Sequence, residues 1–588
     1  MPDNIIPITN LSEHGLIEDT PSVTLPPNAF SDCQNVRFRH GAVRKFPSEV
    51  DEHTAFSNIL HVAFWPSTAG NRIVVVSGNL GIVTVSVINE DGSSTGFGPY
   101  TRPAPPAGTR WQHTIFNGGH HLIINNGRET PFFLQADISG LTDLPNWDSY
   151  LVEEEVLQFV FDGRDIASGG AYTVTNQTLE ENSEIIITRV PRNSGIPITS
   201  FTVTLGPGLV LMPDGTDPDV GTIDSVTATG FRFIPAGGTG GDTFRLRVRS
   251  PVAISVTAGV IRSYGNLLVA GNLMETNGRT LVGTVRTSDV AAPGEIPQNW
   301  NPFRDGANTA DEFILSTTGT VRDMVELQGN LYVYTDTSIH SIQQTGGPIP
   351  FAINVVTESY GASNIDSVIE MDGKHIVFGS DDVYVFAGHP GSISSIVDGR
   401  VRNFFRNAAV SHGDIRIVRF NRWDELWFWS PSEDIAYIWN YRLNNWTKRV
   451  MRDNTLAGVE TFNNLLFTAS TDTDGSIYTV DGPGYLDSAY VERDRLALTP
   501  EFDTETLIAM ALLVDGDDTV DINVRGSNTP GDLDGTTDSP TKAFDIANDY
   551  KTDIRVHGRF LNYRLSHATT NSLNLSGMQF DVLKGGTR

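Results

Sequence analysis

The chain has very little cysteine, since Cys33 is the only one among 588 residues. A single cysteine excludes an intrachain disulfide and is typical of a protein that folds in a reducing cytoplasm. The first residues lack the basic and apolar regions of a signal peptide, and no apolar run approaches the ~20 residues that span a bilayer. We therefore expect neither a secreted disulfide scaffold nor a membrane-spanning segment.

Positive charge is scarce as well. The chain has 41 Lys and Arg residues against 70 Asp and Glu residues, which gives a net charge of −29. Proteins that hold nucleic acid offer Lys and Arg to the phosphates, so this chain is a poor nucleic-acid binder overall. Like charges along a wall prevent adhesion, and we expect DNA to pass over such a surface without specific binding.

Long helical patterns are also missing, whereas short β-type runs recur. The segments Gly329–Ile342 and Gly373–Phe386 align without a gap, which indicates a period of about 44 residues. Seven such hairpins begin at Gly70, Gly119, Gly265, Gly329, Gly373, Asp424 and Asn463. The pattern predicts an all-β protein with a six- or seven-bladed β-propeller, and a string of unrelated hairpins in sandwiches is the alternative.

The repeat is interrupted at two places. About 100 extra residues separate the hairpins at Gly119 and Gly265, and they carry strands of their own, which predicts an inserted β-domain. After Asp481 longer strands alternate with acidic connections, as in a β-sandwich. The predicted domains are an arm with a docking hairpin, the propeller in two parts, the insert and a C-terminal β-sandwich-like domain, at residues 1–50, 51–146 with 260–481, 147–259 and 482–588.

Catalytic and metal-binding motifs are missing too. The sequence has no Gly-x-Ser-x-Gly, His-Glu-x-x-His, Cys-x-x-Cys or dinucleotide-binding glycine motif. Two adjacent strand residues point to opposite faces, so we expect that His120 and His121 do not share a metal. The sequence therefore predicts no enzyme, no cofactor and no metal site.

The segment Trp423–Trp446 is rich in aromatic residues. Alternation along a strand places Trp427 and Trp429 on one face and Phe428 on the other. We expect these side chains to pack between blades, and a sugar-stacking surface is the alternative.

The segment Leu25–Pro47 forms a small basic hairpin in this acidic chain. It contains "LPPNA" and then "NVRFRHG", and the chain ends with "GRFLNYRLS" and "LSGMQFDVLKGG". These motifs resemble those of the tail nozzle proteins of short-tailed bacteriophages, a group also called tail stabilisation or tail tubular protein B-like. The resemblance extends to "LVAGN" and "APGEIPQNW" in the propeller, and it is weak in the insert.

This resemblance implies a structural virion protein that is assembled in the host cytoplasm. Nozzle proteins form a homohexameric ring below the portal and its adaptor, and the genome leaves through the ring. Tail fibres or spikes are further candidate partners. The hairpin would then dock on the adaptor or a neighbouring subunit, unless its arginines are simply solvated; its candidate residues are Arg37, Phe38, Arg39, Arg44 and Lys45. A propeller glycan hydrolase and a receptor-binding adhesin are the alternative functions.

Overall fold

The fold is taken from a computed structural model of the chain. The residues that the structure describes are 4–56, 58–79, 81–102, 110–145, 147, 149–161, 171–175, 177, 179, 181, 183–192, 198–236, 241–253, 256–275, 280–300, 309–345, 351–407, 415–462, 464–470, 475–498, 504–531 and 537–584. Their regular elements are mostly β-strands, with one short α-helix among the described residues, α1 (Arg402–Asn407).

In the described ranges, seven antiparallel sheets form the blades of a β-propeller. Six blades are built on four strands that are consecutive in the chain, and the seventh has three consecutive strands and one strand from near the N-terminus. The first three blades are β8 (Ile59–Ser67), β9 (Gly70–Asn79), β10 (Gly81–Asn89) and β11 (Ser94–Arg102); β12 (Gln112–Phe116), β13 (His121–Asn125), β14 (Phe132–Gln135) and β15 (Leu141–Asp143); and β25 (Val256–Tyr264), β26 (Leu267–Glu275), β27 (Thr280–Thr287) and β28 (Asp311–Ile314).

Blades four to seven follow in chain order. They are β29 (Val321–Leu327), β30 (Asn330–Thr335), β31 (Ile339–Gln344) and β32 (Phe351–Thr357); β33 (Val368–Met371), β34 (Lys374–Phe378), β35 (Val383–Phe386) and β36 (Ser394–Ser395); β37 (Arg416–Phe420), β38 (Glu425–Ser430), β39 (Ile435–Asn440) and β40 (Asn445–Val450); and β41 (Thr455–Glu460), β42 (Leu465–Ser470), β43 (Gly475–Thr479) and β7 (Val50–Phe56). The seven predicted hairpins are the two middle strands of these seven blades.

The ring of blades is closed. Each innermost strand contacts the innermost strand of the next blade, in the order β8, β12, β25, β29, β33, β37 and β41, and β41 contacts β8 again. The seventh blade is completed by β7, which pairs antiparallel with β43. A strand from near the N-terminus thus locks the last blade to the first.

Tight two-residue turns connect the first two strands in two of the repeats. In blade four Leu327 pairs with Asn330, and in blade five Met371 pairs with Lys374, so each hairpin has a two-residue loop. The loop residues, Gln328-Gly329 and Asp372-Gly373, all have positive φ. A type I′ turn requires positive φ at both central residues, which is why a glycine recurs before the second strand of these hairpins.

The chain between blades two and three forms two further sheets around a separate hydrophobic cluster. Their strands are β16 (Ser149–Val160), β17 (Tyr172–Thr175), β18 (Glu184–Val190), β19 (Thr199–Gly206), β20 (Val210–Met212), β21 (Thr216–Asp217), β22 (Gly221–Thr227), β23 (Gly230–Pro235) and β24 (Thr243–Ala253). β16 pairs antiparallel with β24 from Ser149–Ala253 to Val160–Thr243, so the chain leaves and re-enters the propeller side by side. β25 of blade three already begins at Val256.

Strands from both chain ends share two sheets beyond the last blade, which we call the terminal module. It contains β1 (Asn4–Thr9), β4 (Asp32–Gln34), β5 (Val36–Arg39), β6 (Ala42–Lys45), β44 (Ala489–Leu496), β45 (Glu505–Gly516), β46 (Thr519–Ser527), β47 (Thr537–Asp538), β48 (Lys542–Asp545), β49 (Thr552–Gly558), β50 (Phe560–His567) and β51 (Leu573–Lys584). β1 and β6 pair with β51, and β4 pairs with β44. The N-terminal arm is therefore part of this module.

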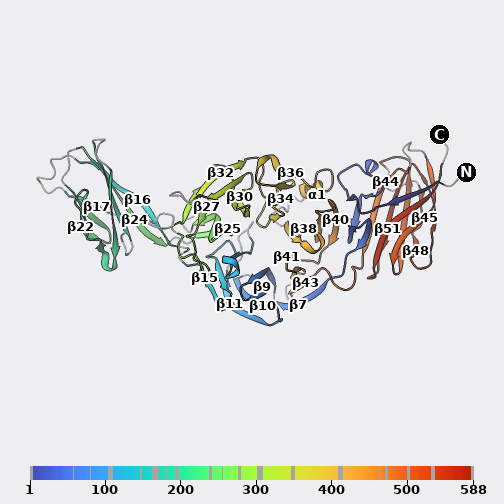
Figure 1. Cartoon of the computed structure of the whole chain (residues 1–588), viewed down its shortest axis with the longest axis horizontal. Coiled ribbons are helices and arrows are strands. Elements are labelled where there is room, and N and C mark those ends of the chain that lie inside the picture. The colour runs from blue at the N-terminus through green and yellow to red at the C-terminus, as the bar shows by residue number, and fades with distance from the viewer. Residues whose placement is uncertain are drawn as a thin grey trace.

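The three parts lie in a row (Figure 1). The insert is at one end, the propeller is in the middle, and the terminal module is at the other end together with both chain termini. Two short strands of the arm, β2 (Gly15–Leu16) and β3 (Ala29–Phe30), extend the sheet of blade six. In the described parts of the chain, no helix has the length and apolar character needed to cross a membrane.

Candidate functional site at the centre of the propeller

Polar side chains from several blades meet at the centre of the ring. They come from the innermost strands, because side chains there face the axis of the ring as well as the neighbouring blades. The set comprises His61 on β8, Gln112 and His113 on β12, Arg262 on β25, Asp323 on β29, Asp366 before β33 and Arg416 on β37. The sequence analysis did not single out this set, because its members are spread over more than 300 residues.

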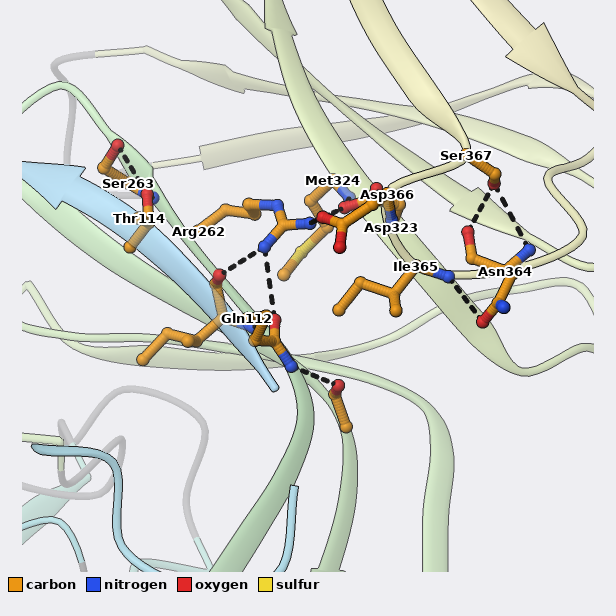
Figure 2. A network of polar contacts seen from close by, with 12 residues as sticks. Gln112, Thr114, Arg262, Ser263, Asp323, Met324, Asn364, Ile365, Asp366 and Ser367 are labelled. Atoms are coloured by element: carbon orange, nitrogen blue, oxygen red, sulfur yellow. Dashed lines mark hydrogen bonds and ion pairs between the residues drawn. The ribbon is translucent and has the colours of Figure 1, made fainter. Parts of the chain in front are cut away.

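Arg262 is the hub of this set (Figure 2). Its Nη2 lies 2.9 Å from Oδ1 of Asp323 and 2.9 Å from Oδ1 of Asp366. Its Nη1 donates to Oε1 of Gln112 at 3.2 Å, and Gln112 donates in turn to the carbonyl of Gly259 at 2.7 Å. One guanidinium group thereby links blades two, three, four and five.

The two carboxylates beside Arg262 have different environments. Asp323 is buried, and its oxygens also accept the backbone N–H groups of Met324 at 2.8 Å and of Asp366 at 2.9 Å. Burial raises the pKa of Asp323 to about 6, against the opposing charge of Arg262. Burial also acts to raise the pKa of Asp366, but the positive charges of Arg262 and Arg110 outweigh it and hold that pKa below its usual range.

A pair of histidines lies beside this network. Nε2 of His61 and Nδ1 of His113 are 2.8 Å apart, so one ring donates a hydrogen bond and the other accepts it. Burial lowers the pKa of His113 to about 4 and lowers that of His61 well below its usual value. Both rings are therefore neutral at pH 7, which is compatible with one ring donating the shared hydrogen bond and the other accepting it.

A cavity of about 330 Å³ opens next to these groups. Its walls include His61, His113, Asp366, Arg416 and Glu460, from blades one, two, five, six and seven. Of the two carboxylates in its wall, Asp366 is paired with Arg262. No three His, Cys, Asp or Glu residues within the described ranges are placed to hold a metal ion. What this arrangement does is join blades through buried, charge-compensated contacts.

Three of the five predicted docking residues are buried in the folded protein. Arg37 donates from Nε and Nη2 to the two oxygens of Glu425, at 2.5 and 3.1 Å, and stacks on the rings of Phe46 and Trp423. Phe38 is buried and stacks on Phe30. These contacts join the arm to blade six, so the two side chains are not available at the surface as a docking clasp requires.

Lys45 is the third buried member of the hairpin. Its ammonium group donates to Nδ1 of His567 at 3.0 Å and to the carbonyl oxygen of Thr569. Burial lowers the pKa of Lys45 to about 8. Sequence reasoning missed this placement because the partners lie more than 500 residues away in the chain.

The other two members of the hairpin remain nearer to solvent. Arg39 is partly buried, lies 3.9 Å from Asp424 and stacks on Trp423. Arg44 is exposed. Binding of a partner chain by this hairpin therefore stays a prediction that rests on Arg44 and the accessible part of Arg39.

The structure bears on two further sequence interpretations. The tryptophan segment is core: Trp427 and Trp429 are buried with Phe467 between blades six and seven, and Phe428 is buried on the opposite face. His120 and His121 both line one surface hollow, and that they do not share a metal stays a prediction. His120 has helical backbone angles just before β13, so the alternation of a strand does not apply to it.

Comparison with known proteins adds little beyond the fold. No family model and no curated protein matches the chain. Similar solved structures include that of U3-55K (7% identity, TM-score 0.34, covering 74% of this chain and 98% of that chain). BamB from Moraxella catarrhalis is another, with 10% identity and a TM-score of 0.32, covering 73% of this chain and 99% of that chain. The RRP9 WD40 repeats are a third, with 8% identity and a TM-score of 0.33, covering 74% of this chain and 99% of that chain. The assignment as a seven-bladed β-propeller protein rests on the strand order and the closed ring of contacts.

Proposed function

We propose that this chain is a structural subunit of a bacteriophage tail nozzle, the ring through which the genome leaves the particle. The observation that carries the proposal is the position, in the fold, of the segments that resemble nozzle proteins. The N-terminal motif covers β3 to β6 and the C-terminal motif covers β50 and β51. β3 extends the sheet of blade six, whereas strand pairing places β4 to β6 in the terminal module with β50 and β51. The motifs from the two chain ends thus meet in one folded unit, while the remaining motifs of the resemblance lie within blade three.

The joint between the terminal module and the propeller supports a load-transmitting role. Arg37 and Glu425 form a buried ion pair across it. Lys448 of blade six contacts Glu18 at 3.0 Å and also Asp32, both on the arm. Buried pairs are strongly destabilising to break, so the joint has a defined geometry. A subunit of a conduit needs such a fixed orientation between its parts.

The charge of the chain supports passage of DNA rather than its binding. Each subunit carries a net charge of −29, and a homohexameric ring multiplies that charge by the number of subunits. DNA held by many phosphate contacts would leave slowly, whereas an acidic wall leaves a hydrated gap.

A propeller hydrolase remains the rival function, because glycosidases use paired carboxyl groups. Asp323 and Asp366 are two carboxyl groups at the propeller centre, and both contact Arg262. Asp323 is 1% exposed and its oxygens accept hydrogen bonds from the backbone. This pair is built to hold blades together, which favours the non-enzymatic proposal.

The test is the mass and shape of the purified chain, measured by mass photometry and cryo-electron microscopy. We expect sixfold rings with six times the 64.1 kDa mass of one chain. A trimer would favour the adhesin. A monomer that releases sugars from host surface glycans would favour the hydrolase, and either result would contradict the nozzle proposal.

A further inference from the structure

A groove of about 310 Å³ runs along the seam where blade seven meets blade one. Glu52 on β7, Phe64 on β8, Asn71 on β9 and Asn464 beside β42 are among its lining residues, together with Glu90 after β10. The groove exists because the N-terminal strand β7 completes blade seven next to the first blade. No function described above uses it.

The groove carries uncompensated negative charge. Glu52 and Glu90 are exposed, and within the described part of the chain neither takes part in an ion pair. Glu90 accepts a hydrogen bond from Asn71, which is neutral. The one cation in the wall, Arg72, is buried and donates to Oδ1 of Asn89 at 3.2 Å and to the carbonyl of Ala136 at 2.6 Å. Within the described part of the chain, Arg72 forms no ion pair with either of the two carboxylates.

Phe64 in the groove wall forms an aromatic pair with Phe462, which directly follows the lining residue Thr461. The rings of Phe64 and Phe462 are 5.3 Å apart and nearly perpendicular. Phe462 is 71% exposed, which is unusual for so large an apolar side chain. An edge-to-face pair leaves a ring face open, and the face of an aromatic ring attracts cations.

We propose that this seam groove binds a lysine or arginine side chain presented by a partner protein. The carboxylates of Glu52 and Glu90 would face the cationic group, and Phe64 and Phe462 would contact its alkyl stem and its charge. Charge complementarity selects this occupant: a neutral sugar or an apolar segment would leave both carboxylates without a counter-charge. The inference is independent of the nozzle assignment.

The experiment uses the full-length chain and a small probe, Nα-acetyl-arginine amide, observed by saturation-transfer NMR. The matched neutral probe is Nα-acetyl-citrulline amide, which has nearly the same shape without the charge. We expect a transfer signal for the arginine probe that falls about fivefold or more for citrulline and for the Glu52→Gln/Glu90→Gln variant. Phe462→Ala should weaken the signal as well.

Glu433→Gln is the control variant, because Glu433 is an exposed carboxylate in a turn of blade six, away from the groove. It should leave the signal unchanged, and all variants should unfold at the same temperature as the parent chain. Equal signals from the two probes, or an arginine signal that survives the Glu52→Gln/Glu90→Gln change, would overturn the proposal. Binding of maltotriose that depends on Phe462 and is not displaced by the arginine probe would also overturn it, in favour of a glycan site.

Discussion

The insert and the terminal module sit at opposite ends of the propeller and are built in contrasting ways. The insert is one continuous stretch of chain with its own hydrophobic cluster, and its first and last strands pair with each other. The terminal module takes strands from both chain ends, and its cluster continues into blades five and six through residues such as Phe378 and Phe428. A continuous stretch can be removed as a unit, whereas an interlocked one cannot.

The largest effect expected from this contrast follows from removing the arm. A chain without residues 1–46 loses β1 and β4–β6, and with them the partners of β51 and β44. The exposed cluster should make this variant aggregate on expression, because the arm contributes buried side chains such as Phe30 and Phe38. Solubility and circular dichroism measure the outcome. A soluble monomer with an intact terminal module would show that the arm is an appendage.

The next effect concerns one ion pair in the joint. Arg37→Ala leaves Glu425 buried without its counter-charge, which typically costs about 3–5 kcal/mol. Arg44→Ala is the matched control on the same hairpin, and an exposed side chain should change stability by less than about 0.5 kcal/mol. Urea unfolding followed by tryptophan fluorescence compares the two variants. Similar midpoints would show that the buried pair does not hold the joint.

Acid should destabilise the propeller more than the insert. Burial lowers the pKa of His113, His121 and His375 to about 4, and all three lie in the propeller. The unfolded chain binds protons at these residues near pH 6.5, whereas the folded chain does so only near pH 4. Their contribution to stability is therefore present above pH 6.5 and is lost as the pH falls toward 4.

Residues 147–259 contain no histidine, so the insert lacks this source of acid sensitivity. In differential scanning calorimetry the propeller transition should fall by about 3 °C or more between pH 6.5 and 5, with a smaller shift for the insert. His113→Gln should make the propeller less sensitive, and His389→Gln, at an exposed position, should not. A propeller transition that does not move over this range would contradict the assignment of these rings as buried and neutral.

The smallest effect is expected from removing the insert. Replacing residues 149–253 with a short Gly/Ser linker joins two points that are paired neighbours in β16 and β24. The propeller should stay soluble and keep its unfolding temperature within about 2 °C, because the removed residues pack on their own cluster. Global unfolding of this variant would place the insert in the core of the protein.

The contrast between continuous and interlocked parts also explains which features the sequence could predict and which it could not. Local patterns are sufficient to predict a blade, so the hairpins at Gly329 and Gly373 were predicted correctly. Two structural sites that depend on contacts between distant segments of the chain were not predicted. Lys45 meets His567, and Arg262 meets Asp366, only after the ends of the chain and the blades have come together. The positive charge of the hairpin predicted that its side chains are exposed, but packing against distant segments buries Arg37 and Lys45.

Cryo-electron microscopy of phage particles that contain this chain is the most direct test of the nozzle proposal. We expect a sixfold ring of propeller-shaped densities below the portal and its adaptor, with the DNA path along the ring axis. Density for the chain at the tip of a fibre or spike, with threefold symmetry and away from the DNA path, would contradict it.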